Sequence, residues 1–108
     1  MIVIQEYLDA DDNNPFTRWF DGLNAQAALK VTAYMTRLEN GNFSASKGIG
    51  GGVYECRIDW GPGYRVYFGR DGETLIILLG GGAKKRQQAD IDRAKARWQQ
   101  YKKEKRER

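Results

Sequence analysis

The sequence predicts a small α+β protein with the element order strand, helix, helix, three antiparallel strands, helix. Apolar residues recur every three or four positions between residues 15 and 40 and again after residue 88, which is the helical period. Between residues 53 and 79 they alternate or run together, as they do in strands. Asn-Pro, Asp-Gly and glycine clusters mark the boundaries. We therefore expect a mostly antiparallel sheet, a helical hairpin on one of its faces and a C-terminal helix.

Length and composition set the class of the protein. The 108 residues suffice for one domain, 1–108, whose last residues, 102–108, are expected to form a frayed basic tail. With 41% hydrophobic and 30% charged residues, the chain resembles ordinary soluble proteins. No apolar run approaches the roughly 20 residues that span a bilayer, and the first residues lack a basic leader. We expect a cytoplasmic protein with no membrane partner.

Charge is unevenly distributed along the chain. Residues 1–40 hold three Lys/Arg against six Asp/Glu, whereas residues 41–108 hold fifteen against eight, and the net charge is +4. A polyanion such as nucleic acid would be attracted to the second half, although lysine-rich and arginine-rich helices also serve solubility alone.

The chain contains no histidine and a single cysteine, Cys56. An internal disulfide is excluded and a zinc site nearly so, and we expect no metal ion and no cofactor. Cys56 itself is expected to be a small buried hydrophobe. Any catalysis must rest on Glu, Tyr, Lys or Arg.

The first half of the chain predicts a strand and two helices. Residues 2–8 form the opening strand, and Asn14 followed by Pro15 starts a short helix that Gly22 ends. A second helix covers residues 24–40. The segment 42–52, with its isolated Lys47, is expected to be a loop because it is too rich in glycine to hold secondary structure.

The second half begins with two amphipathic strands. One face carries Tyr54, Cys56, Ile58, Tyr64, Val66 and Phe68, and the helical hairpin should cover it. The other face carries Glu55, Arg57, Arg65 and Tyr67, which we expect to remain within reach of solvent or of a ligand.

Asp71-Gly72 predicts a two-residue hairpin. That turn would place Phe68 opposite Leu75 and Arg65 opposite Leu78, with Ile76 and Leu78 on the same face as the arginines. Residues 74–79 would then form a central strand that the glycines 80–82 end. A cationic run at 84–86 and a last helix follow, and the helix should dock on the sheet through a narrow stripe made of Ile91, Ala94, Trp98 and Tyr101.

Two arginines on one face of adjacent strands repel each other. They need either carboxylate partners, for which Glu55 and Asp59 are available, or a polyanionic ligand. The second alternative suits RNA cleavage without a metal ion, which requires a base, cations that stabilise charge on the phosphate, and an acid. Arg57 and Arg65 can stabilise charge, Glu55 is the best available base, and Tyr67 or Tyr101 can stack on a base or relay a proton.

The segments LENGNF, VYECRI, GPGYRVYF, LLGGGAKK and QADIDRAK together resemble the RelE/ParE/HigB superfamily of type II toxins, in particular its short "addiction module killer protein" branch. The resemblance implies a RelE-like sheet whose first strand lies at one edge. It also implies translation inhibition by mRNA cleavage on the ribosome (an mRNA interferase activity) and neutralisation by a cognate antitoxin, with operator DNA bound only through the antitoxin complex.

The resemblance also assigns roles to residues. Combined with the chemistry above, the catalytic candidates are Arg57, Arg65, Glu55, Tyr67 and Lys84, and the candidates that bind RNA phosphates or bases are Lys47, Lys85, Arg86 and Tyr101. Two alternatives remain open. The ParE branch shares the scaffold but poisons DNA gyrase, and a non-catalytic module would bind only nucleic acid or its antitoxin.

Overall fold

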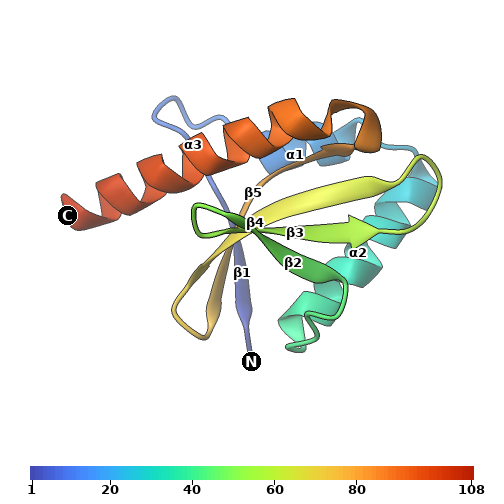
Figure 1. Ribbon diagram of the computed structural model, residues 1–108, viewed down its shortest axis with the longest axis horizontal. Coiled ribbons are helices and arrows are strands. Elements are labelled where there is room, and N and C mark those ends of the chain that lie inside the picture. Colours follow the sequence, from blue (N-terminus) through green and yellow to red (C-terminus); the bar gives the residue numbers. More distant parts are fainter.

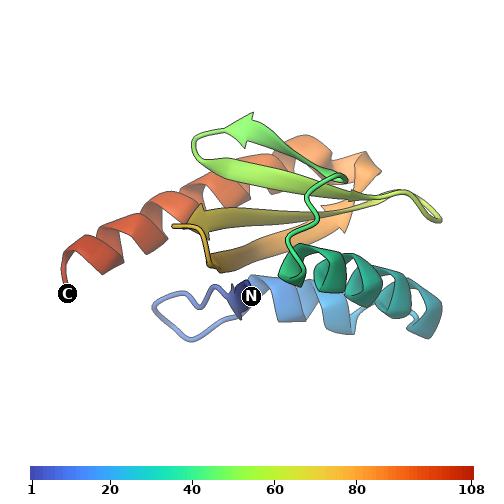
Figure 2. The ribbon, with the colours of Figure 1, turned by 90° about the horizontal axis from the view of Figure 1, so that it is seen from below.

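A computed structural model describes all 108 residues, and in it a five-stranded sheet lies between two layers of helix (Figures 1 and 2). The strands are β1 (Val3–Glu6), β2 (Ser46–Gly50), β3 (Val53–Ile58), β4 (Tyr64–Asp71) and β5 (Leu75–Ala83). The helices are α1 (Pro15–Asp21), α2 (Ala25–Glu39) and α3 (Gln87–Arg106), the last preceded by a 3₁₀ turn, η1 (Lys84–Arg86). The predicted α+β class is confirmed.

The strands follow the spatial order β1-β5-β4-β3-β2. Only the β1–β5 pair is parallel, and the other neighbours are antiparallel. The opening strand therefore lies at one edge, as expected, and β5 lies inside the sheet.

Asparagine side chains cap the first two helices, and the first of these starts lies where the sequence predicted it. The side chain of Asn14 accepts a hydrogen bond from the amide of Thr17 (3.0 Å), and Pro15 occupies the first helical position. Asn24 caps α2 in the same way through the amide of Ala27 (2.9 Å). Each cap satisfies an amide that would otherwise lack a partner.

The two faces of the sheet bury separate apolar clusters. The α1–α2 hairpin packs over one cluster, which contains Cys56, Ile58, Val66 and Phe68, as the alternation predicted. On the opposite face α3 packs over a second cluster with Tyr67 and Leu79 (Figure 2). Ala94 and Trp98 of α3 are buried there, with Ile91 and Tyr101 packed against them, so the predicted stripe is confirmed.

The prediction of a loop over residues 42–52 is wrong for residues 46–50, which form β2. Strand β2 pairs with β3, with Ser46 opposite Cys56 and Lys47 opposite Glu55. An edge strand needs backbone partners on one side only, so it can form with little apolar content. The glycines gather at its end instead, where Gly50, Gly51 and Gly52 have φ values of +94°, +65° and +83° and turn the chain.

The predicted register of β4 and β5 is also wrong. Phe68 pairs with Leu78 rather than Leu75, and Arg65 pairs with Gly82. Asp71 pairs directly with Leu75, so the loop holds three residues rather than two, and a bulge follows between Tyr67 and Phe68. As a result Ile76 and Leu78 face the helical hairpin, not the arginine face.

Glycines 80–82 do not end the last strand, because β5 continues through them. A Cβ atom at Gly81 would lie 2.3 Å from the ring of Trp19, and one at Gly82 would lie 2.0 Å from Oδ2 of Asp90. The absence of side chains therefore lets α1 and α3 approach the strand closely.

The helix α3 also extends into residues 102–108, which were predicted to be a frayed tail. It continues to Arg106, so most of the expected frayed tail is helical. Lys105 Nζ contacts both carboxylate oxygens of Asp71 at 2.6 Å, which ties the far end of α3 to the sheet. None of the helices combines the length and the apolar content that crossing a membrane requires.

Candidate functional site

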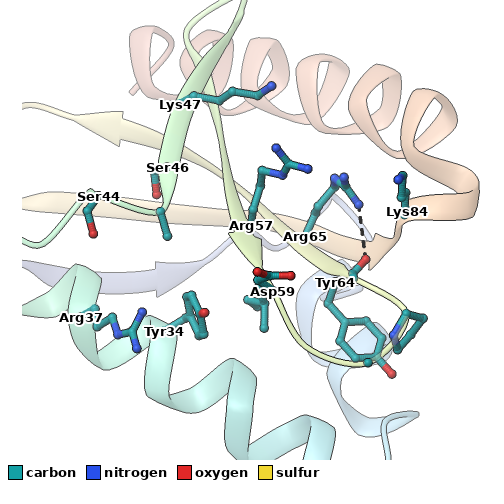
Figure 3. Close-up of a pocket in the computed structure, with 15 residues that line it drawn as sticks. Tyr34, Arg37, Ser44, Ser46, Lys47, Arg57, Asp59, Tyr64, Arg65 and Lys84 are labelled. Carbon is teal, nitrogen blue, oxygen red and sulfur yellow. Dashed lines mark hydrogen bonds between the residues drawn. The ribbon is translucent and has the colours of Figure 1, made fainter.

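A cleft of about 690 Å³ opens where β2, β3 and β4 meet η1 and the C-terminal half of α2. We call it the strand cleft. Its cationic residues are Arg37, Lys47, Arg57, Arg65 and Lys84, and Asp59 is its one carboxylate. Figure 3 shows Lys47, Arg57, Arg65 and Lys84 side by side along its upper rim.

The sheet register creates this row of cations. Arg57 and Arg65 lie directly opposite each other on β3 and β4. Lys47 on β2 lies opposite Glu55, two residues before Arg57. The amide of Lys84 donates to the carbonyl of Gly63 (3.0 Å), which holds η1 beside the β3–β4 turn.

Glu55 and Arg65 form a buried pair, so the expectation that both face solvent is wrong. Their exposed fractions are 0% and 4%, and Arg65 Nε lies 2.6 Å from Glu55 Oε1. Gln87 Nε2, from the first turn of α3, donates to the same oxygen (2.8 Å). Arg65 Nη1 also donates to the carbonyl of Gly63 (3.3 Å). Of the four residues of the predicted polar face, Glu55, Arg65 and Tyr67 are buried and only Arg57 is exposed.

Two polar atoms of this buried network lack hydrogen-bond partners. Glu55 Oε2 makes no hydrogen bond, and Lys47 Nζ lies 4.0 Å from it. Arg65 Nε lacks a well-directed hydrogen bond despite its short distance to Oε1. Such a network is held in place by the charge of its members, because a buried carboxylate and a buried guanidinium each need the other. Gln87 was missed by sequence reasoning, since nothing in the helical period distinguishes it.

The predicted exposure of Tyr67 is also wrong. Its side chain is buried under α3, and its hydroxyl makes no hydrogen bond. Burial is the main cause that raises the pKa of Tyr67, with the charge of Glu55 adding to it. Tyr67 therefore belongs to the apolar cluster under α3 and does not line the strand cleft.

Tyr101 lies at a different place in the molecule. Its hydroxyl donates to Asp71 Oδ2 (2.7 Å), and its ring stacks on Trp98 with centroids 5.2 Å apart. Burial first, and then the bond to Asp71, raise the pKa of Tyr101 to about 12. The structure thus separates Tyr101 from the residues with which it was grouped.

Arg57 is the arginine of the strand cleft that remains exposed on the sheet. No carboxylate oxygen lies within 4.0 Å of its guanidinium nitrogens. Lys47 and Lys84 are exposed beside it. Of the predicted candidates, the structure brings together Arg57, Arg65, Lys47 and Lys84, with Glu55 beneath them.

Several residues of the cleft were not anticipated. Arg37 and Tyr34 come from α2, with the Arg37 guanidinium carbon 4.3 Å from the centre of the Tyr34 ring, and Tyr64 lines the opposite side. Tyr64 also stacks on Trp60, which is half-buried and packs against the main apolar cluster. The alternation of the strands predicted that the helical hairpin covers one face of the sheet, but it did not indicate which residues of α2 reach the cleft.

The cationic run 84–86 divides at η1. Lys84 lines the strand cleft, Arg86 lines a second cleft on the other side, and Lys85 is exposed and lines neither. No group of three or more acidic, cysteine or histidine side chains gathers closely enough to hold a metal ion.

Residues 18–99 match the family described as Phage derived protein Gp49-like (DUF891). The chain belongs to the Gp49-like family. This is a toxin-like addiction-module family, and the part that matches the Gp49-like pattern contains every residue that lines the strand cleft. The chain is also similar to an uncharacterized protein of Haemophilus influenzae, with 44% identity over 81 residues that cover 74% of this chain and 82% of the relative.

Proposed function

We propose that this Gp49-like protein is the toxin of a type II toxin–antitoxin pair and stops translation by metal-independent cleavage of mRNA on the ribosome. The observation that carries the proposal is the unpaired Arg57, which lies between Lys47 and Lys84 in an open cleft. A guanidinium without a carboxylate partner is free to bind a phosphate through two nitrogens. Tyr34 and Tyr64 line the same cleft, where aromatic rings can stack on unpaired bases.

The proposed reaction is attack by a ribose 2′-oxygen on the adjacent phosphorus. The new bond gives a 2′,3′-cyclic phosphate, and the bond to the 5′-oxygen breaks. Asp59, the carboxylate of the cleft, would accept the 2′-hydroxyl proton, and the ammonium of Lys84 would give a proton to the leaving 5′-oxygen. Arg57 would stabilise the charge that develops on the phosphate.

Glu55 takes a different role from the general base first expected. Because it is buried and bound to Arg65 and Gln87, we assign it to positioning Arg65. An exposed aspartate is a weak base at neutral pH, so the chemistry depends on a partner that holds the RNA in line. The ribosome supplies that alignment in this proposal.

The test compares Arg57→Ala with Lys30→Ala. Lys30 is an exposed cation on α2 outside the cleft, so both variants lose one positive charge. After brief induction, primer extension on cellular messages should reveal new 5′ ends in translated regions with the wild type and Lys30→Ala, but not with Arg57→Ala. Arg57 suits this test better than Arg65 because its replacement leaves no buried carboxylate unpaired.

Other outcomes would support the alternatives. Intact messages with growth arrest and impaired supercoiling would place the protein with gyrase poisons. Intact messages without growth arrest would indicate a module that only binds nucleic acid or its antitoxin. A co-expressed antitoxin should restore growth in either toxic case.

A further inference from the structure

A second basic cleft, of about 360 Å³, lies on the other side of η1. We call it the arginine cleft, because Arg18 of α1, Arg86 of η1, and Arg93 and Arg97 of α3 line it. Its floor includes Gly80 and Gly81. The pairing of β1 with β5 extends only to Leu78, so this stretch of β5 has no strand beside it on that side.

The two carboxylates in the arginine cleft do not neutralise its four arginines. Asp9 accepts hydrogen bonds from the amides of Asp11 and Asn13 (2.8 and 2.9 Å), and none of the arginines lies within 4.0 Å of its carboxylate oxygens. Asp90 lies 3.5 Å from Arg93. Arg18 donates to the neutral side chain of Asn13 (3.0 Å), and Arg86 has no acidic partner within 4.0 Å.

Arg97 feels the resulting excess of positive charge. Its Nη1 donates to the carbonyl of Leu79 (2.9 Å), which holds the half-buried side chain against the strand. Burial lowers the pKa of Arg97 and the positive charge of Arg93 lowers it further, while Tyr7, Asp90 and Asp9 offset part of this shift. Like charges held this close cost electrostatic free energy, which a bound anion would offset.

The two clefts share η1. Lys84 faces the strand cleft and Arg86 faces the arginine cleft, two residues apart in one turn. We propose that the arginine cleft binds backbone phosphates of the same RNA strand that enters the strand cleft, so that the substrate is a single strand crossing η1. This inference rests on the proposed function and specifies its substrate as a strand longer than the strand cleft alone can hold.

The test measures binding of fluorescein-labelled 2′-O-methyl oligonucleotides, which lack the attacking hydroxyl and are not cleaved. Their lengths run from about four to about sixteen nucleotides, the range of single-strand site sizes. The double variant R18Q/R93Q removes one exposed arginine from each side of the arginine cleft. The control K30Q/K103Q removes the same charge at exposed positions outside both clefts. Thermal melting checks that all variants are folded.

We expect R18Q/R93Q to bind the longest oligonucleotide about tenfold more weakly than K30Q/K103Q at 0.1 M salt, and the shortest one equally well. The slope of log K against log salt for the longest should fall by about 1.4, for two lost phosphate contacts. Equal affinities of the two double variants for the longest oligonucleotide would overturn the inference, as would an equal loss for the shortest.

The outcome separates this inference from the proposed function. Suppose that message cleavage needs Arg57 and that R18Q/R93Q binds long strands normally. This result would contradict only the proposed RNA binding by the arginine cleft. Suppose instead that R18Q/R93Q weakens length-dependent binding but no message is cleaved. This result would support the extended RNA-binding site and contradict the ribonuclease activity. No binding of any oligonucleotide by the wild type would overturn the inference, while message cleavage would still decide the proposed function.

Discussion

Arg57 and Arg65 are the same residue type in directly paired positions on one sheet face, yet their environments differ. Arg65 lies nearer the middle of the sheet, where Gln87 at the start of α3 closes over its partner Glu55. Arg57 lies one strand closer to the edge and remains exposed. One position across the sheet therefore separates a structural ion pair from a cation that is free for a ligand.

The two arginines should respond differently to the same substitution. Arg65→Gln leaves the carboxylate of Glu55 buried without its cation, and should lower the free energy of unfolding by about 3 kcal/mol. Arg57→Gln should change it by less than about 0.5 kcal/mol, because it removes an exposed charge that repels its neighbour. Urea denaturation measures both. Equal losses in the two variants would contradict the assignment of Arg65 to a buried pair.

At the scale of elements, α3 depends on glycines in the sheet. A Cβ at Gly69 would lie 2.3 Å from the ring of Trp98, and one at Gly52 would lie 2.7 Å from its Nε1. Because these glycines have no Cβ atom, the indole of Trp98 packs directly against the backbone. Farther along, Asp71 at the end of β4 accepts hydrogen bonds from Tyr101 and Lys105, which attach the exposed C-terminal half of α3.

This attachment predicts that the stability of the protein depends on pH. Hydrogen bonds from Lys105 first, and then from Tyr101, hold the pKa of Asp71 below its ordinary value of 3.8. The stabilisation is thus present above that value and is lost as the pH falls through the lower pKa of the folded state. Asp71→Asn should be less stable than the wild type at pH 7, by under about 1 kcal/mol because the site is partly exposed.

Thermal melts of both proteins between pH 7 and pH 2 would measure this difference. We expect the two curves to converge at the acidic end, where the wild-type carboxylate is also neutral. A difference that stays constant across the range would show that charge on Asp71 does not stabilise α3. Tyr101→Phe serves as the control, because it removes one hydrogen bond and keeps the ion pair with Lys105.

At the scale of the whole molecule, the sheet has a core on each face, and Cys56 lies within the larger one. Its side chain is 1% exposed, and burial raises the pKa of its thiol. Both the helical hairpin and the strands must separate before a reagent reaches it.

Labelling of Cys56 should therefore report global unfolding. In native buffer the thiol should react more slowly than in urea by a factor of at least about 10³, because the reactive form is populated only through unfolding. As the only cysteine, it gives an unambiguous signal. The rate should rise with urea in parallel with the unfolding equilibrium. Rapid stoichiometric labelling of the native protein would indicate a local opening between α2 and β3.

Local signals in the sequence determined the elements that depend on local physics. The helix start at Asn14 and Pro15, the second helix near residues 24–40 and the two-residue period from Val53 each involve neighbours along the chain, and all agree with the structure. The predicted β4–β5 register was wrong because the turn holds three residues, and the number of residues in the turn sets which residues pair. The edge strand β2 was not predicted because its glycines are typical of a loop, and its pairing with β3 stabilises it almost entirely.

The sequence also supplied the residue types of the candidate site, including Arg57, Lys47 and Lys84. Only the tertiary structure decided which of them face a ligand. Alternation along a strand specifies a face of the sheet, but whether a helix then covers that face depends on contacts between distant segments. Gln87 of α3 contacts Glu55 across 32 positions of sequence, and Tyr67 packs against Ala94 and Trp98 of the same helix. Arg57 stays exposed and open to a phosphate.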